Sequence, residues 1–292
     1  MDVRRDAFRS MGTDVSLVTA ADVPASSFRT ATEGVRATFA REDLRFSRFR
    51  VDSELSRLNA RAGRSTRVTA EMTDVLRLAI DAADRTAGLF DPTVLLSLVA
   101  AGYDRDFDEL LAGARGVLHP SQPCGRWLEV EVNGRSVRLP EGVAVDLGGI
   151  AKGWTVDRAA ERALATGLPW ALVNAGGDLR IVGSPPEIEI AVEDPEAPGD
   201  LAARVRVDSG ALATSSVTRR AWAPGMHHLI DPRTALPAET GVLQATVWAE
   251  TCAEAEVRAK WALLEGRPSL DRFPAVLVVD DGPIVTNLGK AA

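Results

Sequence analysis

The sequence predicts an α+β fold, with mixed sheets and packed helices, from three observations. Segments with alternating apolar residues, which favour strands, are mixed with segments of helical periodicity. The segments do not follow the regular strand–helix–strand order of a doubly wound parallel sheet. Two strand pairs, within 127–140 and 170–183, are joined by short turns that contain glycine, as hairpins are.

The length of 292 residues allows one large domain or two small ones. The polar stretch at 194–200 is typical of an exposed turn rather than of a domain linker. There is no internal repeat and no low-complexity tract. We therefore expect a single domain over residues 1–292.

The first third of the sequence predicts one strand and two helices. Alternation over residues 6–19 indicates the strand, and apolar residues recur at helical intervals over 25–47. A second helix is predicted over 69–87, where Thr69 can cap the first turn and Gly88 marks the end.

The rest of the sequence is predicted to be rich in strands. Its clearest hairpin, at 127–140, has Asn133 and Gly134 where a type I′ turn is expected. The other predicted strands lie at 143–146, 170–183 (two strands around a glycine turn), 187–193, 202–208, 226–230, 242–249, 275–279 and 284–287, and the predicted helices at 150–166 and 251–265.

The composition is that of an ordinary globular protein. Hydrophobic residues make up 46% and charged residues 26%, which excludes a disordered chain. The net charge of −7 argues against a nucleic-acid surface, which needs a basic face. A small anionic ligand is still compatible, because backbone N–H groups and one cation can bind a phosphate locally.

The sequence indicates a cytoplasmic protein. Cys124 and Cys252 lie far apart and have no partner at metal-binding spacing, so a reducing compartment is expected. No apolar stretch is long enough for a signal peptide or a membrane span, so we expect no membrane insertion.

The segment DLGGIAKG (146–153) predicts a ligand-binding turn. An apolar strand ends in Asp146, a glycine pair follows, and Lys152 stands in the first turn of a helix. Glycines let a ligand approach the backbone, and a helix N-terminus with a nearby cation suits a diphosphate. Turns of this composition are also common without function, so the segment alone leaves both interpretations open. Lys152 is one of only three lysines among 34 basic residues.

Three further segments carry polar groups beside small residues. NAGGD (174–178) places Asp178 after a glycine pair, and SGALATSS (209–216) is predicted to be a small-residue loop with backbone and hydroxyl donors. HHLIDPRT (227–234) combines His228 with Asp231, a pair that could accept a proton near neutral pH. A plain hairpin and a structural histidine are the alternatives.

Seven motifs in a fixed order together resemble the FAD:protein FMN transferase (ApbE) family, from about Phe8 to the C-terminal strands. They are MGT (11–13), SELSRLNA (53–60), AGLFDPTV (87–94), DLGGIAKG (146–153), NAGGD (174–178), SGALATSS (209–216) and HLIDPRT (228–234). The resemblance implies an α+β fold that binds FAD as substrate. It also implies transfer of FMN to a Thr or Ser hydroxyl of an acceptor protein, with release of AMP and with Mg²⁺ as the usual metal.

The resemblance also implies roles for individual residues. Met11 and Phe49 match flavin contacts, and Gly149 matches a position whose carbonyl binds the metal. The other expected FAD contacts are Ala87, Gly88, Leu89, Asp146, Lys152, Asp178 and Ile230. Independently of the resemblance, the chemistry of the residues makes His228 with Asp231 the expected proton acceptor of the transfer, which otherwise depends on positioning and charge neutralisation.

The chain departs from the family at the metal site. In the family a late helix carries an Asp and, four residues later, a Thr; here Glu256 and Lys260 occupy these positions. A protonated lysine cannot bind a hard cation. The Lys260 ammonium could replace the metal in catalysis, or Glu254 or Glu256 could still bind Mg²⁺ with Lys260 turned away. In the third alternative, Glu256 and Lys260 form an ordinary surface ion pair in a protein that has lost transfer activity.

Three functions therefore stand as hypotheses. The first is an enzyme that transfers FMN from FAD to a partner protein. The second is an FAD pyrophosphatase, in which water replaces the acceptor hydroxyl and FMN and AMP are released. The third is a non-catalytic FAD-binding protein, which the altered metal pair would favour.

Overall fold

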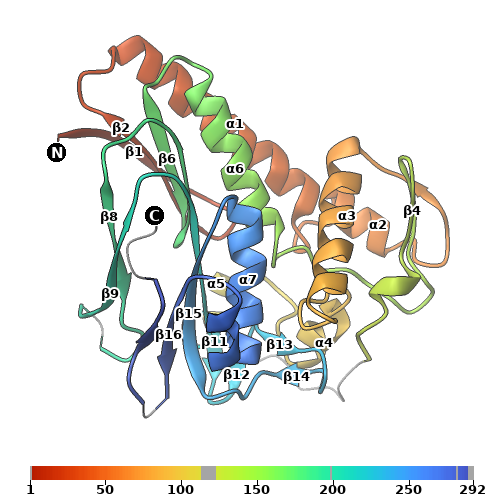
Figure 1. The fold of residues 1–292 in the computed structure, drawn as a ribbon. Coiled ribbons are helices and arrows are strands. Elements are labelled where there is room, and N and C mark those ends of the chain that lie inside the picture. The colour runs from red at the N-terminus through yellow and green to blue at the C-terminus, as the bar shows by residue number, and fades with distance from the viewer. Residues whose placement is uncertain (1, 113–122, 198, 281, 289–292) are drawn as a thin grey trace. The chain divides into compact units, whose positions relative to one another are not determined.

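The computed structural model describes residues 2–112, 123–197, 199–280 and 282–288 (Figure 1). The chain divides into two compact units. Unit 1 comprises Met1–Glu42, Lys152–Ser216 and Gly241–Ala292, and unit 2 comprises Asp43–Ala151 and Val217–Thr240. Each unit contains both helices and strands, which confirms the predicted α+β class.

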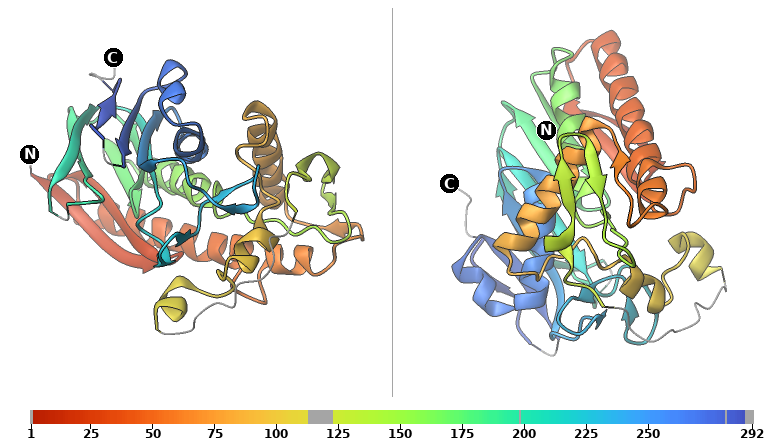
Figure 2. Two further views of the ribbon diagram at one scale, coloured as in Figure 1. Left: turned by 90° about the horizontal axis from the view of Figure 1, so that it is seen from below. Right: turned by 90° about the vertical axis from the view of Figure 1, so that its right-hand side faces the viewer.

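Unit 1 is built on an eight-stranded sheet with neighbours in the order β1-β2-β6-β7-β10-β15-β16-β17. All its pairings are antiparallel. The N-terminal strands form one edge and the C-terminal strands the other (Figure 2). The strands are β1 (Val3–Ser10), β2 (Thr13–Ala20), β6 (Trp170–Ala175), β7 (Asp178–Gly183), β10 (Gly210–Ser216), β15 (Val242–Ala249), β16 (Ala275–Val279) and β17 (Val285–Thr286).

Three long helices belong mainly to unit 1. Helices α1 (Ala25–Phe46) and α6 (Ala151–Leu164) lie side by side, and a Cβ at Gly34 would contact the Arg162 side chain (Figure 1). Helix α7 (Cys252–Glu265) packs on β7, β10 and β15. The predicted helices 25–47, 150–166 and 251–265 are thus confirmed.

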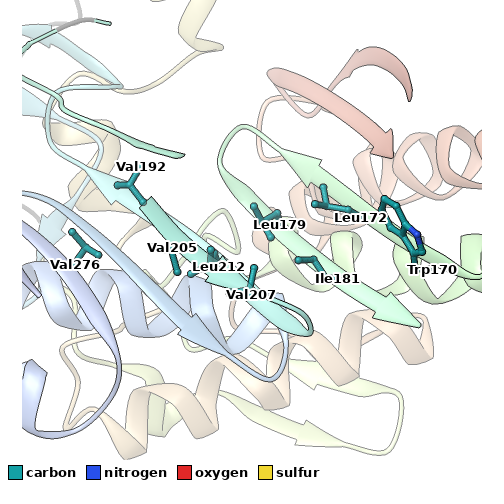
Figure 3. Packing of buried hydrophobic residues seen from close by; sticks show 9 residues of the cluster. All are labelled: Trp170, Leu172, Leu179, Ile181, Val192, Val205, Val207, Leu212 and Val276. Carbon is teal, nitrogen blue, oxygen red and sulfur yellow. The ribbon is translucent and has the colours of Figure 1, made fainter. Parts of the chain in front are cut away.

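A separate hairpin, β8 (Ile188–Glu193) with β9 (Leu201–Val207), buries its apolar residues against the main sheet. Val192, Val205 and Val207 form one cluster with side chains of β6, β7, β10 and β16 (Figure 3). The outer positions of the hairpin carry cross-strand ion pairs, such as Glu189 with Arg204. Apolar and charged residues therefore lie on opposite faces, as alternation predicts.

The predicted strand over 6–19 is wrong in one respect, because the segment is a hairpin of two strands. Met11 and Gly12 form its two-residue loop, with φ of 50° and 67°. Positive φ at both loop positions is what a type I′ hairpin requires. Methionine rarely adopts that conformation, so the sequence gives no turn signal there.

The predicted small-residue loop at 209–216 is also wrong. Gly210–Ser216 is strand β10, paired with β7 on one side and β15 on the other, and almost fully buried. Its residues are small because helix α7 packs across them. Large alternating side chains, the usual signal of a strand, are absent for the same reason.

Unit 2 is built from short elements. Its helices are α2 (Glu54–Asn59), α3 (Ala70–Arg85), α4 (Leu95–Ala100), α5 (Phe107–Leu111) and the 3-10 turn Trp127–Glu129. Its strands are β3 (Thr66–Arg67), β4 (Glu131–Asn133), β5 (Ser136–Arg138), β11 (Ala221–Ala223), β12 (Met226–His227), β13 (Ile230–Asp231) and β14 (Leu236–Pro237). Helix α3 begins after Thr69, whose hydroxyl accepts from Met72 N–H, as predicted.

Three predictions in unit 2 need correction. The hairpin at 127–140 turns at Gly134 and Arg135, one residue later than predicted, because Asn133 pairs with Ser136 in the ladder. Residues 143–146 form no strand, since Val145 bonds through N–H and C=O to the side-chain amide of Asn59. The strand predicted over 226–230 is divided between β12 and β13.

Among the described residues, no helix combines the length and the apolar character that a membrane crossing requires.

Candidate functional site

Two hairpin turns meet at one end of the unit 1 sheet. The Met11–Gly12 turn joins β1 to β2, and the Gly176–Gly177 turn joins β6 to β7. Gly176 N–H donates to the Asp14 carbonyl at 3.0 Å, and a Cβ at Gly176 would collide with the Thr13 side chain. With φ of 62° and 96°, the glycine pair has the conformation and the clearance that this approach needs.

Lys152, in the first turn of helix α6, binds both residues that flank the Gly176–Gly177 hairpin turn. Its Nζ lies 2.5 Å from Asp178 Oδ2 and 3.2 Å from the Ala175 carbonyl. Asp178 is buried, and its other oxygen accepts from Thr214 N–H at 3.2 Å. The DLGGIAKG and NAGGD motifs are thus joined by a short ion pair.

Glu256 and Lys260, one turn apart on α7, form a second ion pair, and Glu256 is bound by the residue that follows Lys152. Glu256 Oε2 accepts from Gly153 N–H at 2.9 Å, and Oε1 lies 3.5 Å from Lys260 Nζ. The Glu256 side chain is only 4% exposed, and that of Lys260 is 18% exposed. We call Lys152, Asp178, Glu256 and Lys260 the charge cluster.

The other charges of the charge cluster act on the pKa of Glu256. Burial raises the pKa of Glu256, and the Lys260 charge opposes that rise. Asp178 raises the same pKa and Lys152 lowers it. Two cations and two carboxylates therefore act on one another, and the cluster is neutral as a group.

Two neighbours of the charge cluster fix the position of α7. Gly153 has no room for a side chain, since a Cβ there would lie 2.5 Å from the Cys252 carbonyl oxygen. Asp157, one turn further along α6, accepts from Cys252 N–H at 2.7 Å and Ala253 N–H at 3.0 Å. Asp157 therefore caps α7 from a neighbouring helix, together with the N-cap Thr251.

The capping carboxylate of Asp157 is itself perturbed. Burial raises its pKa from 3.8 to about 6, although the two backbone N–H bonds and the Arg180 charge act in the opposite direction. Arg180 Nε lies 3.5 Å from Asp157 Oδ1. Desolvation of a carboxylate that no cation contacts closely has this effect.

In unit 2 a buried arginine organises the candidate ligand residues. The Arg48 side chain is 8% exposed; its Nε lies 3.0 Å from Asp146 Oδ2, and its Nη1 donates to the Tyr103 carbonyl at 2.7 Å. The guanidinium lies 4.2 Å from the ring centroid of Phe49 and 4.3 Å from that of Tyr103. Within the described residues, its buried Nη2 has no hydrogen-bond partner.

Aromatic and aliphatic side chains continue from this arginine. Tyr103 lies against Trp222 with ring centroids 5.3 Å apart. Ile230 belongs to the same apolar cluster as Tyr103, and Phe49 packs against that cluster. We call Arg48, Phe49, Tyr103 and Trp222 the arginine–aromatic cluster; it brings the expected contacts Phe49, Ile230 and Asp146 together.

The loop at 87–89 follows α3 directly. Gly88 N–H donates to the Ala83 carbonyl at 2.8 Å, and Ala87 adopts a left-handed φ of 49°. Beyond it, buried Asp91 accepts from Thr93 N–H at 2.7 Å and Gly125 N–H at 2.5 Å. The Asp91 carboxylate of the FDPT segment therefore joins two loops by hydrogen bonds, and its role is structural.

Two residues of the histidine motif, His227 and Asp231, have structural roles. His227 is buried, with Nε2 3.1 Å from the Ala238 carbonyl and Nδ1 accepting from Leu229 N–H, and burial lowers its pKa. Asp231 accepts from Arg233 Nε at 2.8 Å and Nη2 at 2.6 Å. Burial raises the pKa of Asp231, but the Arg233 bonds outweigh it and hold that pKa below the usual value.

Left-handed backbone at non-glycine residues concentrates in these motifs. Among the described residues it occurs at Met11, Ala87 and Ala235, with φ of 50°, 49° and 58°. Met11 and Ala87 are expected flavin contacts, and Ala235 follows HLIDPRT. Strain of this kind costs energy and often marks ligand-binding segments.

The expected site residues thus fall into two groups, one in each unit. Unit 1 holds Met11, Lys152, Asp178, Glu256 and Lys260; unit 2 holds Phe49, Ala87, Gly88, Leu89, Asp146, Gly149, His228, Ile230 and Asp231. Sequence reasoning missed Arg48, Gly153 and Asp157. The available signal was their position in the sequence, because Arg48 directly precedes Phe49 and Gly153 directly follows Lys152.

The chain is similar to known proteins of one family. The ApbE family model matches residues 11–273. The chain is 31% identical over 248 residues to the FAD:protein FMN transferase of Rhodobacter capsulatus, an alignment covering 79% of this chain and 47% of that protein. It is 27% identical over 281 residues to the enzyme of the same name from Treponema pallidum, covering 87% and 77%.

A solved structure gives the same result for the fold. The ApbE protein of Thermotoga maritima superposes with a TM-score of 0.87 at 26% identity, covering 98% of this chain and 97% of that one. The chain spans about half the length of the Rhodobacter relative and about three quarters of the Treponema one. Because the family model covers most of the sequence and includes every motif described above, the chain belongs to the ApbE family.

Proposed function

We propose that the chain is an FAD:protein FMN transferase, which moves FMN from FAD to a Thr or Ser hydroxyl of an acceptor protein and releases AMP. The observation that carries the proposal is the contact between two motifs in unit 1, Lys152 of DLGGIAKG with Asp178 of NAGGD, at 2.5 Å. This ion pair fixes a cation in the first turn of a helix. Such a place suits a diphosphate.

The chemistry asks for little more than position and charge. The acceptor oxygen forms a bond to the FMN phosphorus, the bond from that phosphorus to the bridging oxygen breaks, and the electron pair leaves with AMP. The hydroxyl proton passes to a base. Neutralisation of the phosphate oxygens and orientation of the hydroxyl supply most of the catalysis in reactions of this class.

Within this proposal we assign the base to His228. Asp231 is held by several bonds to Arg233, and its lowered pKa makes it a weak proton acceptor near neutral pH. Asp231 would then shape the loop that carries His228. The ring of His227 is occupied by backbone groups and serves the fold.

The flavin ring is assigned to unit 2. Phe49 and Ile230 offer apolar surface beside Asp146, and the 87–89 loop offers strained backbone. The family model runs without interruption through segments of both units, and we propose that residues 1–292 act as a single ApbE-like domain.

The residues expected to bind Mg²⁺ do not fit that ion. Hard cations prefer oxygen ligands, and Mg²⁺ requires six of them in near-octahedral geometry. Here an ammonium lies 3.5 Å from one oxygen of Glu256, and the other oxygen accepts from Gly153 N–H. In the described part of the chain, no three His, Cys, Asp or Glu side chains form a group able to hold a metal. We therefore derive no step through a metal, and Gly149 keeps only the role that the family resemblance implies.

A cytoplasmic location is part of the proposal. Both cysteines are free, Cys252 being fully buried and Cys124 partly so. Free thiols are typical of a reducing compartment, and this supports the proposed location.

The test uses purified full-length chain, FAD and a flavin-acceptor domain. We expect the acceptor to become fluorescent in a denaturing gel and to gain the mass of one FMN, with AMP released in equal amount. The same domain without its target hydroxyl is the control.

Other outcomes identify the alternatives. FMN and AMP formed without any acceptor would indicate an FAD pyrophosphatase. Bound but intact FAD in the presence of a competent acceptor would refute both enzymatic functions and leave an FAD-binding protein. The His228→Gln variant should lose transfer while it still binds FAD, and unchanged transfer would refute its assignment as the base.

A further inference from the structure

Glu256 on helix α7 holds the ammonium group of Lys260 in a fixed position. Lys260 Nζ lies 3.5 Å from Glu256 Oε1 and 3.4 Å from the Glu256 carbonyl oxygen. Both contacts run along the helix, so α7 itself fixes the ammonium. The side chains are largely buried, which separates this pair from an ordinary surface pair.

A comparison within α7 makes the point sharper. Glu254 and Arg258 form another i,i+4 pair, with side chains 22% and 31% exposed, against 4% and 18% for Glu256 and Lys260. The more exposed pair uses arginine, the common basic residue of this chain. The buried pair uses lysine, which occurs only three times, and Lys152 in the same cluster is another of these three.

The rest of the charge cluster already balances its charges. Lys152 is paired with Asp178, and Glu256 is paired with Lys260 and bound by Gly153 N–H. A divalent ion at Glu256 would have to displace the ammonium or lie against it. The divalent ion and the ammonium are both positive, and two like charges in contact repel strongly where water is largely excluded.

We propose that the Lys260 ammonium, together with Lys152, supplies the positive charge that diphosphate cleavage needs, so that this chain acts without a divalent metal ion. The inference rests on the proposed function. The reaction is balanced as described above: one phosphorus–oxygen bond forms, one breaks, and the hydroxyl proton passes to a base. Lys260 neutralises phosphate oxygens and takes no part in the proton transfer.

Metal binding is measured first, without FAD, as the shift in melting temperature on adding MgCl₂ or MnCl₂ to the full-length chain. We expect no shift for the unmodified protein. The Lys260→Thr variant should melt at a lower temperature, because Glu256 loses its cation, and Mg²⁺ should raise that temperature again. The Arg258→Thr variant is the matched control and should acquire no response to Mg²⁺.

Transfer of FMN is measured second, in EDTA and in MgCl₂. The unmodified chain should be equally active in both. Lys260→Thr should lose at least tenfold in EDTA and recover with Mg²⁺. An unmodified chain that is inactive in EDTA, is activated by Mg²⁺ and is stabilised by Mg²⁺ alone would overturn the inference while the transferase function stands.

Two further provisions keep the test decisive. If Lys260→Thr does not fold, the double variant Glu256→Gln/Lys260→Met removes both charges together; it should fold, lose transfer in EDTA and not regain it with Mg²⁺. If it retains full activity, Lys260 has no part in the reaction. If no acceptor is flavinylated under any condition, the transferase function fails, and the melting experiment still decides whether the ammonium excludes the metal.

Discussion

The charge cluster of unit 1 and the arginine–aromatic cluster of unit 2 both bury ionised groups, but they hold them in different ways. In unit 1 the charges stand on regular elements: Lys152 on α6, Asp178 on β7, Glu256 and Lys260 on α7. Each has a charged partner. In unit 2, Arg48 and Asp146 stand on loops, and the guanidinium is held by one carboxylate, one carbonyl and two rings.

The difference has a physical consequence. A hydrogen-bonded ladder or helix fixes the charges of unit 1, so a substitution there disturbs mainly the electrostatic balance. In unit 2 the side chains themselves fix the loops, so a substitution disturbs local structure as well. In the described residues, the buried Nη2 of Arg48 has no hydrogen-bond partner. The hydrogen bonding of this guanidinium is therefore incomplete.

The largest effect is expected at Glu256. Glu256→Gln should lower the free energy of unfolding by about 3–5 kcal/mol, because Lys260 then keeps a largely buried charge without its partner. Urea denaturation measures the change. Glu254→Gln on the same helix is the control and should cost less than about 1 kcal/mol, since its pair is more exposed. Equal losses would show that burial of the pair is unimportant.

The next effect depends on pH and concerns Asp157. Its pKa of about 6 in the folded chain exceeds the ordinary 3.8, so folding favours the protonated form. The associated stabilisation is complete below the unfolded pKa and is lost as the pH rises through about 6. It amounts to at most about 3 kcal/mol, at 1.36 kcal/mol per pKa unit.

The Asp157→Asn variant should therefore lose this part of the pH dependence. Free energies of unfolding at several values between pH 4 and pH 7 would show a falling curve for the unmodified chain and a flatter one for the variant. Identical slopes in the two proteins would mean that Asp157 does not titrate in this range.

In unit 2 the corresponding substitution is Arg48→Lys. Lysine keeps the charge but cannot bond Asp146 and the Tyr103 carbonyl in the same fork, nor stack between two rings. We expect a loss of about 1.5–3 kcal/mol in the free energy of unfolding. Arg126→Lys, whose pair with Glu129 is exposed, is the control and should change stability by less than about 1 kcal/mol. A small effect at Arg48 would indicate that loops, not this side chain, hold the site.

The same contrast explains what the sequence could predict. Helices α1, α3, α6 and α7 and most strands of the main sheet follow from periodicity and caps, because local patterns determine them. Strand β10 was missed because its residues are small for the sake of α7, a contact distant in sequence. The Met11–Gly12 turn was missed because its left-handed methionine has no composition signal.

The candidate site shows the same division. The i,i+4 spacing of Glu256 and Lys260 and the helix-start position of Lys152 were visible in the sequence. The ion pair of Lys152 with Asp178, the bond from Gly153 to Glu256 and the capping of α7 by Asp157 were not, since each joins segments brought together only by folding. Arg48 was hidden among 31 arginines, most of which carry no such burial.

The smallest effect is expected where strain, rather than charge, distinguishes the loops of unit 2. Ala235 has a φ of 58°, and its N–H donates to the Asp231 carbonyl at 2.8 Å, so the conformation is fixed by the loop. Ala235→Gly should relieve the left-handed penalty and stabilise the chain by about 0.5–1 kcal/mol. Ala60→Gly, at a right-handed position with φ of −64°, should have the opposite sign. If both glycines destabilise equally, the left-handed alanine carries no measurable strain, and the loop after HLIDPRT is as relaxed as the regular elements of unit 1.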